Sequence, residues 1–206
     1  MLSDRLGVRI YRGMSHPRIL AFAGSLRTHS LNKKLVRYAA EMAKAEGAEI
    51  TTIDLRDYPL PLFDGDLEER EGLPENAKKL KAMFREHDGL LIASPEYNSS
   101  ITAVLKNAMD WVSRAESEGE PSLVAFRGKV AALMSASPGA LGGLRGLVHL
   151  RVILGNLGVI VLPEQVAVPK AHEAFDEQGL LKDQRTASQV TAVAQGLSAF
   201  LKKHIG

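Results

Sequence analysis

The stretch RILAFAGSLRTHSLN, residues 18–32, passes from an apolar run through a short polar loop into an amphipathic segment. The apolar run, residues 18–23, is aliphatic or aromatic on both faces, which is typical of a strand covered on two sides. The amphipathic segment begins at Leu31, repeats apolar residues at helical spacing and ends near Gly47, where a helix C′ glycine is expected. The stretch therefore predicts a strand, a loop and a helix in succession.

The same alternation of short apolar runs and amphipathic segments continues along the whole chain. Such a pattern indicates an α/β fold, a doubly wound five-stranded parallel sheet with helices on both faces joined by right-handed crossovers. The expected strands are residues 18–23, 48–55, 89–94, 129–136 and 158–162, and the expected helical stripes lie at residues 31–42, 101–112, 144–151 and 190–201.

The chain shows no internal repeat or low-complexity linker, and its 206 residues suit one well-buried domain. We expect a single domain over residues 17–206, preceded by an N-terminal extension, residues 1–16. Two polar segments, residues 59–76 and 114–122, are expected to be loops, and the first is long enough for a lid or an interface element.

The composition, with 45% hydrophobic and 24% charged residues, is that of a soluble globular protein. The formal net charge is +2 and no basic run or basic stripe with interleaved aromatics occurs, so nucleic-acid binding is not expected. The apolar runs are short, and the first residues lack the apolar core of a signal peptide. A membrane partner is therefore not expected, and the cytoplasm is the expected location.

The chain contains no cysteine, which excludes disulfides, thiolate metal sites and dithiol redox chemistry. None of its six histidines has neighbours at metal-ligand or catalytic-triad spacing. No metal site and no catalytic side chain are therefore expected. If this protein transfers electrons, a bound cofactor must carry them.

Three segments stand directly after expected strands, where open parallel sheets bind their ligands. The first is GSLRTHSLN, residues 24–32, at the start of a helix. Ser25, Ser30 and Asn32 can donate hydrogen bonds there, and Arg27 can pair with a phosphate through its planar fork. A single glycine with no lysine after it matches neither the dinucleotide nor the Walker A fingerprint. Phosphate binding is the favoured interpretation, and helix capping by these side chains is the alternative.

The second segment is SPEYNSSITAVLKNAMDW, residues 94–111. Tyr97 offers a flat ring and Asn98 can bond to the polar edge of a heterocycle. For Glu96 a structural role near a helix N-terminus is favoured over a role as general base. The two serines that follow Asn98, Ser99 and Ser100, are candidate N-caps of the next helix. The only tryptophan of the chain, at position 111, is expected in the core or an interface rather than at a cofactor.

The third segment is SASPGALGGLRG, residues 135–146, with glycines at positions 139, 142, 143 and 146. Glycine allows main chain to approach a flat ligand, although a flexible turn without chemical role is the alternative. Together the three segments describe a phosphate-binding loop, a wall with an aromatic ring and an amide, and a glycine-lined platform. This combination suits a planar heterocycle with a terminal monophosphate, and FMN fits it better than a dinucleotide.

These three motifs, in this order, resemble the NADPH-dependent FMN reductase family of flavodoxin-like proteins, which includes quinone, chromate and azo-compound reductases. The resemblance covers most of the chain from about Arg18 onward, and PEYN followed by LKNAMDW is its most specific part. Family members often carry Pro-Gly where this chain has Thr102 and Ala103, so the entry into that helix departs from the family's pattern.

The resemblance implies a flavodoxin-like fold that binds FMN without a covalent bond, takes electrons from NAD(P)H and forms a homodimer or homotetramer. The residues implied to contact FMN fall into three groups. The phosphate would be held by Ser25, Leu26, Arg27, Ser30, Leu31 and Asn32, the ribityl chain and ring would be lined by Pro95, Glu96, Tyr97 and Asn98, and the isoalloxazine would be approached by Ser137, Pro138, Gly139, Gly142 and Gly143.

The expected function is an FMN-dependent NAD(P)H oxidoreductase whose acceptor is a small molecule: a quinone, an azo compound, a metal oxyanion or free flavin. In such an enzyme the cofactor carries the chemistry and the protein supplies positioning and electrostatics. The alternative is a flavodoxin-type electron carrier or a flavin-binding sensor without NAD(P)H activity. Carriers of this type are often strongly acidic, and this chain is not.

Overall fold

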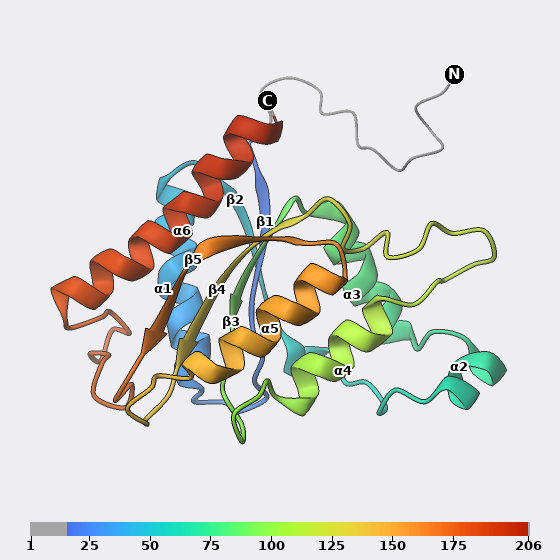
Figure 1. The fold of residues 1–206 in the computed structure, drawn as a ribbon, viewed down its shortest axis with the longest axis horizontal. Coiled ribbons are helices and arrows are strands. Elements are labelled where there is room, and N and C mark those ends of the chain that lie inside the picture. Colours follow the sequence, from blue (N-terminus) through green and yellow to red (C-terminus); the bar gives the residue numbers. More distant parts are fainter. Residues whose placement is uncertain (1–15, 206) are drawn as a thin grey trace.

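The computed structural model describes residues 16–205, and within them five parallel strands form one sheet in the order β2-β1-β3-β4-β5 (Figure 1). This confirms the expected α/β class with a five-stranded parallel sheet. The expected N-terminal extension, residues 1–16, lies outside the described residues except for His16. The strands are β1 (Arg18–Ala23), β2 (Glu49–Asp54), β3 (Gly89–Ala93), β4 (Val130–Ala136) and β5 (Ile160–Val168).

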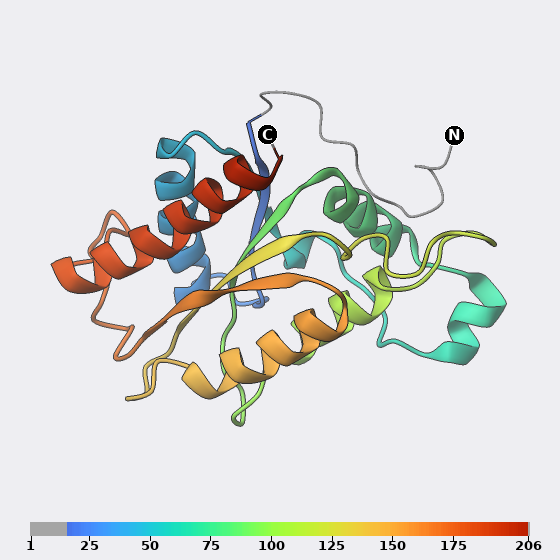
Figure 2. The same ribbon diagram turned by 45° about the horizontal axis from the view of Figure 1, so that its top comes forward.

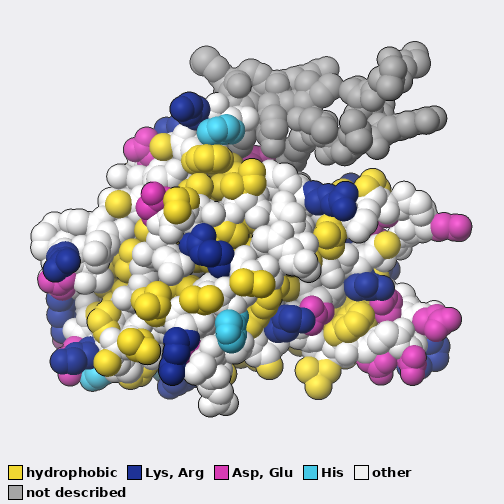
Figure 3. Space-filling model, viewed as in Figure 1, with side chains coloured by type: hydrophobic (Ala, Val, Ile, Leu, Met, Phe, Trp, Pro, Cys, Tyr) yellow, Lys and Arg dark blue, Asp and Glu magenta, His cyan; other side chains and the backbone are white. Residues whose placement is uncertain are grey.

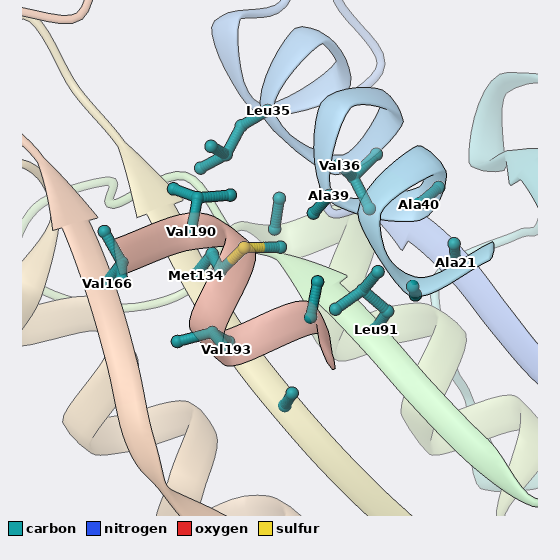
Figure 4. Close-up of a cluster of buried hydrophobic side chains, with 14 of the residues drawn as sticks. Ala21, Leu35, Val36, Ala39, Ala40, Leu91, Met134, Val166, Val190 and Val193 are labelled. Atoms are coloured by element: carbon teal, nitrogen blue, oxygen red, sulfur yellow. The ribbon is translucent and has the colours of Figure 1, made fainter. Parts of the chain in front are cut away.

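Helices cover both faces of the sheet (Figure 2). On one face α1 (Leu31–Ala45) and α6 (Gln184–Ile205) enclose a core whose side chains come from both helices and from four strands. Figure 4 shows part of this core, to which α1 contributes Leu35, Val36, Ala39 and Ala40, the strands Ala21, Leu91, Met134 and Val166, and α6 Val190 and Val193.

On the other face α3 (Glu75–Glu86), α4 (Ala103–Val112) and α5 (Leu144–Asn156) enclose a second core built around aromatic contacts. The ring of Phe84 lies 5.6 Å from that of Phe22 and 5.3 Å from that of Phe126. Trp111 is fully buried and donates to the carbonyl of Pro61 at 2.9 Å, which agrees with its expected core position. No helix within residues 16–205 has the length and apolar character needed to cross a membrane.

The long segment 59–76 is not entirely loop, because it contains α2 (Gly65–Glu71) and the start of α3. Asp64 caps α2 by accepting from the main chain of Asp66 and Leu67, and the helix buries none of its residues. A helix held by its cap rather than by an apolar face carries no helical periodicity. That is why the sequence pattern suggested a loop.

Two other element boundaries differ from the sequence-based prediction. Strand β5 continues past Pro163 to Val168, because its pairing with β4 shifts register between Ala131 and Leu133 and β5 lies at the edge of the sheet. Proline is tolerated at such edge irregularities. Helix α5 turns Leu144 and Val148 toward solvent, so the expected stripe at the start of this helix is wrong. The side chains of α5 that are fully buried are Leu147, Leu150 and Leu154.

The strand order determines which loops lie together at the carboxyl ends of the strands, the edge of the sheet where a ligand is expected. The chain runs from β1 to β2 on one side and then to β3 on the other, so the strand order reverses between β1 and β3. The loops that follow β1 and β3 therefore leave adjacent strands at the same edge, and the loop after β4 lies next to them. In this strand order the reversal point is where flavodoxin-like proteins bind their ligand.

Candidate functional site

The first loop, residues 24–30, connects β1 to α1 and contains two buried serines. The hydroxyl oxygen of Ser25 accepts from the main-chain N–H of Arg27 at 3.3 Å, and that of Ser30 accepts from the N–H of Lys33 at 3.4 Å. Ser30 is thus the N-cap of α1, so the capping alternative is confirmed for this serine. Because both oxygens act as acceptors, the two hydroxyl hydrogens remain available to a ligand.

The main chain of this loop offers further donors. The N–H groups of Leu26, Leu31 and Asn32 make no hydrogen bond to any residue within 16–205. The side chain of Arg27 is exposed and likewise has no hydrogen bond or ion pair with those residues. Free N–H groups at a helix N-terminus beside an arginine form a suitable environment for a phosphate. The residues present therefore fit the terminal phosphate of FMN.

Asn32 differs from the other expected phosphate ligands because its side chain is already engaged. Its Nδ2 donates to the carbonyl of Ala136 at 2.7 Å, and its Oδ1 accepts from the N–H of Ala136 at 2.9 Å. These two bonds join the first turn of α1 to the end of β4. The carboxamide that the sequence suggested for phosphate binding is thus occupied by the strand that precedes the third loop, and only the main-chain N–H of Asn32 remains for a ligand.

The second loop follows β3 and turns sharply at the ligand edge. Tyr97 and Ser100 exchange main-chain hydrogen bonds at 2.9 and 3.1 Å, and the two residues between them, Asn98 and Ser99, both have positive φ. This geometry is that of a type I′ turn, in which asparagine is favoured. The turn leaves the ring of Tyr97 52% exposed, while Pro95 before it is buried.

The type I′ turn also delays the start of the next helix. The N-cap of α4 is Thr102, whose hydroxyl accepts from the N–H of Leu105 at 3.3 Å. The expectation that Ser99 or Ser100 caps this helix is therefore wrong. Ser99 is held at positive φ within the turn, and the hydroxyl of Ser100 is 2.9 Å from Nδ1 of His149 on α5.

Glu96 connects the second loop to α5. Its Oε1 accepts from the guanidinium of Arg145, and its Oε2 accepts from the N–H of Gly146 at 3.1 Å. Burial alone would raise the pKa of Glu96, but the hydrogen bonds from Arg145 and Gly146 outweigh it and hold the pKa below its usual range. Because Gly143 at the N-cap of α5 has no side chain, Glu96 supplies the cap from another loop. The structural role expected for Glu96 is present in the structure.

The third loop, residues 137–143, contains two glycines that are required by packing within the chain. A Cβ on Gly142, at φ +62°, would lie 2.7 Å from main-chain atoms of Ala167 and Val168. A Cβ on Gly143, at φ +92°, would lie 1.9 Å from Oγ of Ser135. Both glycines are buried, whereas Gly139 is exposed, as is Pro138, and Ser137 is half-buried. Of the expected platform residues, Pro138 and Gly139 are thus the exposed ones, and the main chain of Gly139 bonds to Ser137, Gly142 and Lys170.

The oxygen of Ser135, at the end of β4, is a buried side-chain atom without a hydrogen-bond partner among the described residues. It lies against Gly143, at the N-terminus of α5 and beside the second loop.

No group of three or more His, Asp or Glu residues within residues 16–205 is arranged to hold a metal ion.

The strand order and the helices on both faces define a flavodoxin-like fold, and comparison with known proteins gives the family. The family model described as NADPH-dependent FMN reductase matches residues 17–173. The chain is 34% identical to an NAD(P)H-dependent FMN reductase of Pseudomonas aeruginosa, over 90% of this chain and 96% of that protein. It is 30% identical to a quinone reductase of Escherichia coli K12, over 90% of this chain and 95% of that one.

Among solved structures, the chain is similar to FerB, a flavoenzyme NAD(P)H:(acceptor) oxidoreductase from Paracoccus denitrificans. The TM-score is 0.77 and the identity 28%, over 91% of this chain and 98% of that one. The chain belongs to the NADPH-dependent FMN reductase family. The sequence-based expectations of this family, of an oxidoreductase enzyme, and of FMN with NAD(P)H as donor are therefore confirmed.

Several residues that shape the site were not selected from the sequence. Asp54 at the end of β2 accepts from Nζ of Lys33 on α1 at 2.5 Å and from the N–H of Arg56 at 3.0 Å. Arg56 in turn donates to the carbonyl of Leu26 in the first loop. A polar residue at the end of a parallel strand indicates a position near the ligand edge of the sheet, and Asp54 at the end of β2 is such a residue. Nothing in the local sequence indicates which loop Arg56 contacts.

Proposed function

We propose that this protein transfers electrons from NAD(P)H to a quinone through FMN bound at the edge formed by the three loops. The observation that carries the proposal is the first loop together with the start of α1. Within residues 16–205 the N–H groups of Leu26, Leu31 and Asn32 and the side chain of Arg27 have no hydrogen-bond partner, and Ser25 and Ser30 use their hydroxyl oxygens as acceptors. Six expected contacts remain proposals supported by this geometry: the side chains of Ser25, Arg27 and Ser30 and the main-chain N–H groups of Leu26, Leu31 and Asn32.

FMN, when bound, supplies the chemistry that accepts a hydride from the nicotinamide and passes two electrons to the acceptor. The balanced reaction consumes NAD(P)H, a proton and a quinone and yields NAD(P)⁺ and the hydroquinone. In this proposal the chain's own residues hold the phosphate at the first loop, and Tyr97 and Gly139 stay exposed at the edge. The same opening would receive donor and acceptor in turn.

The quinone is proposed as the acceptor because the relatives include a quinone reductase of Escherichia coli and NADPH:quinone oxidoreductases of plants. Azo compounds, metal oxyanions and free flavin are the other acceptors to compare. The rival function, a carrier or sensor, requires that NAD(P)H fail to reduce the bound flavin.

The experiment is anaerobic mixing of the FMN-loaded protein with NADH or NADPH, followed by addition of each acceptor. Bleaching of the flavin by the nicotinamide and its rapid reoxidation by a quinone support the proposal. A flavin that neither nicotinamide reduces would leave the carrier or sensor as the function. Reduction without reoxidation by quinones would remove the quinone as acceptor.

We further propose that the protein is a homodimer or homotetramer with α5 at an interface between copies. Along α5, Val148 and Val152 are 54% and 67% exposed, and Leu144 and Leu141 extend the same apolar stripe toward the third loop. Figure 3 shows hydrophobic side chains gathered over the face that carries α5 and β5. An exposed apolar stripe of this kind typically marks a protein interface.

Two further proposals concern the boundaries and location of the protein. We keep residues 17–206 as one FMN-binding domain, since the family match begins at residue 17 and the terminal helix α6 packs into the core beside α1. The cytoplasm remains the proposed location because it supplies NAD(P)H.

A further inference from the structure

Two carbonyl groups of the first loop are held by side chains from other elements. The carbonyl of Gly24 accepts a hydrogen bond from the hydroxyl of Thr102 at 2.7 Å. Thr102 is only 2% exposed, and the same hydroxyl caps α4 by accepting from Leu105. A Cβ on Gly24 would meet the Leu105 side chain at 2.9 Å, so the start of the loop lies directly against this helix turn.

The carbonyl of Leu26 is held from the opposite side of β1. It accepts from Nε of Arg56 at 2.9 Å and also from Nη2 of the same guanidinium. The main chain of Arg56 is itself fixed, because its N–H donates to Asp54 at 3.0 Å and Asp54 pairs with Lys33 on α1 at 2.5 Å. The main chain of Arg56 is therefore fixed, through Asp54 and Lys33, to α1, the helix that follows the first loop.

The orientation of a loop carbonyl matters for anion binding. A peptide group is planar and trans, so its carbonyl and its N–H point in opposite directions and cannot both face a ligand. A carbonyl turned toward a phosphate would repel it, whereas an N–H would bind it. Holding the Gly24 and Leu26 carbonyls on Thr102 and Arg56 fixes two peptide planes of the loop. The N–H groups of these planes, from Ser25 and Arg27, bond to Ala23 and to the hydroxyl of Ser25, so the effect on the ligand is to keep the two carbonyls turned away from it.

We propose that Thr102 and Arg56 are positioning residues for the phosphate of FMN, which keep the carbonyls of Gly24 and Leu26 away from the ligand through these two contacts. The inference rests on the proposed function, because it assumes that the first loop binds the phosphate. It adds two residues that do not touch the phosphate and that act through the main chain of the loop.

Thr102 donates to Gly24 through its side-chain hydroxyl, which a residue without a hydroxyl cannot replace. The link between the α4 cap and Gly24 therefore depends on the threonine found here.

The experiment measures equilibrium binding of FMN and of riboflavin to the full-length apoprotein by quenching of flavin fluorescence. Riboflavin shares the ring and ribityl chain but lacks the phosphate. The variants are Arg56→Met and Thr102→Val, with the conservative pair Arg56→Lys and Thr102→Ser. The matched control is Arg70→Met on α2, where the arginine pairs with the exposed Glu71 and with no other residue of the described part of the chain. Thermal unfolding of each apoprotein is recorded alongside.

Arg56→Met and Thr102→Val are each expected to raise the FMN dissociation constant about 10-fold, which corresponds to about one lost hydrogen bond. The riboflavin dissociation constant is expected to change less than about 2-fold, since positioning acts on the phosphate. Thr102→Ser is expected to restore FMN affinity, Arg56→Lys to restore part of it, and Arg70→Met to leave it unchanged.

Equal weakening of FMN and riboflavin would overturn the inference, because it would indicate a general effect on the loop rather than on phosphate binding. Unchanged FMN affinity in Arg56→Met and Thr102→Val would overturn it as well. If the unaltered protein binds FMN no more tightly than riboflavin, the phosphate assignment of the proposed function itself is wrong. The failure of each idea is therefore seen in a different measurement.

Discussion

The carboxylate of Glu96, just after β3, accepts hydrogen bonds at 2.8 and 2.6 Å from the guanidinium of Arg145 in the first turn of α5. The side chain of Glu96 is 8% exposed, whereas that of Arg145 is 58% exposed. The carboxylate of the pair is therefore shielded from water and the guanidinium is not. The pair joins the loop expected to line the flavin to the helix that follows the glycine loop. Its strength therefore bears on both stability and the geometry of the site.

Replacing Glu96 with glutamine is expected to destabilise the apoprotein at pH 7 by about 1–3 kcal/mol, the cost of weakening a buried charge-assisted bond. The pKa of Glu96 lies below its ordinary value of 4.5 in the folded protein. The stabilisation it gives is therefore complete above that ordinary value and is lost as the pH falls through the lower, folded value. The difference in the free energy of unfolding between the parent and Glu96→Gln should thus become smaller as the pH is lowered.

Thermal unfolding of both proteins at neutral pH and near pH 3 checks this prediction. Glu69→Gln on α2 is the matched control, because Glu69 is exposed and its substitution should change stability at neither pH. An equal difference between parent and Glu96→Gln at both pH values would contradict the role given to the ionised carboxylate.

Arg27→Ala is expected to weaken FMN binding by about 10- to 100-fold, because the phosphate charge loses a charge-assisted partner. The measurement is the flavin retained after exhaustive dialysis, together with the dissociation constant. Arg70→Ala, which removes an exposed arginine from α2, should retain flavin as the parent does. Retention of flavin by Arg27→Ala at the parent level would show that this arginine is not a phosphate ligand.

Gly143→Ala is expected to lower the free energy of unfolding by about 2–4 kcal/mol, from strain at positive φ and from overpacking. Its Cβ would lie 1.9 Å from Oγ and 3.0 Å from Cβ of Ser135. Gly196→Ala is the matched control, since this glycine of α6 has nothing within 4 Å of the added carbon. It should stabilise the protein by about 0.5–1 kcal/mol. Urea unfolding of both variants measures the free energy of unfolding. The same change in this free energy for Gly143→Ala and Gly196→Ala would contradict the steric argument.

The double variant Val148→Glu/Val152→Glu is expected to convert the proposed oligomer into monomers, because charges on the apolar stripe of α5 would be desolvated in an interface. Light scattering after size-exclusion chromatography measures the mass. Ala199→Glu, an exposed position on α6, should leave the mass unchanged. A parent protein that is already monomeric, or an oligomer that survives both glutamates, would show that α5 is not the interface.

The sequence predicted the three central strands within one or two residues at each end. Strands β1, β3 and β4 are buried on both faces, so their apolar runs stand out from the flanking polar residues. Helix α3, which the sequence-based expectations lack, also carries a helical pattern in Ala77, Leu80 and Phe84, so its position is predictable from the sequence. The extension of β5 past Pro163 was not predictable locally, because it depends on the irregular pairing with β4.

The candidate site was predictable to the level of loops. The carboxyl ends of neighbouring parallel strands meet at one edge, so polar residues after strands converge there whatever their sequence distance. The partners within that edge were not predictable in the same way. Asn32 bonds to Ala136, 104 residues away, and Glu96 to Arg145, 49 residues away. A side chain able to bind phosphate is equally able to bind main chain, and only the folded arrangement decides between them.

The bond between Asn32 and Ala136 has a consequence for how quickly the cofactor is exchanged. Together with the contacts of Glu96 and Thr102, it fixes the strands and helices that flank the three loops through groups of the protein itself. The conformational entropy of these loops is thus lost when the chain folds and not when a ligand arrives. The apoprotein is therefore a preorganised receptor, in which association should be fast and affinity should be set mainly by how slowly FMN leaves.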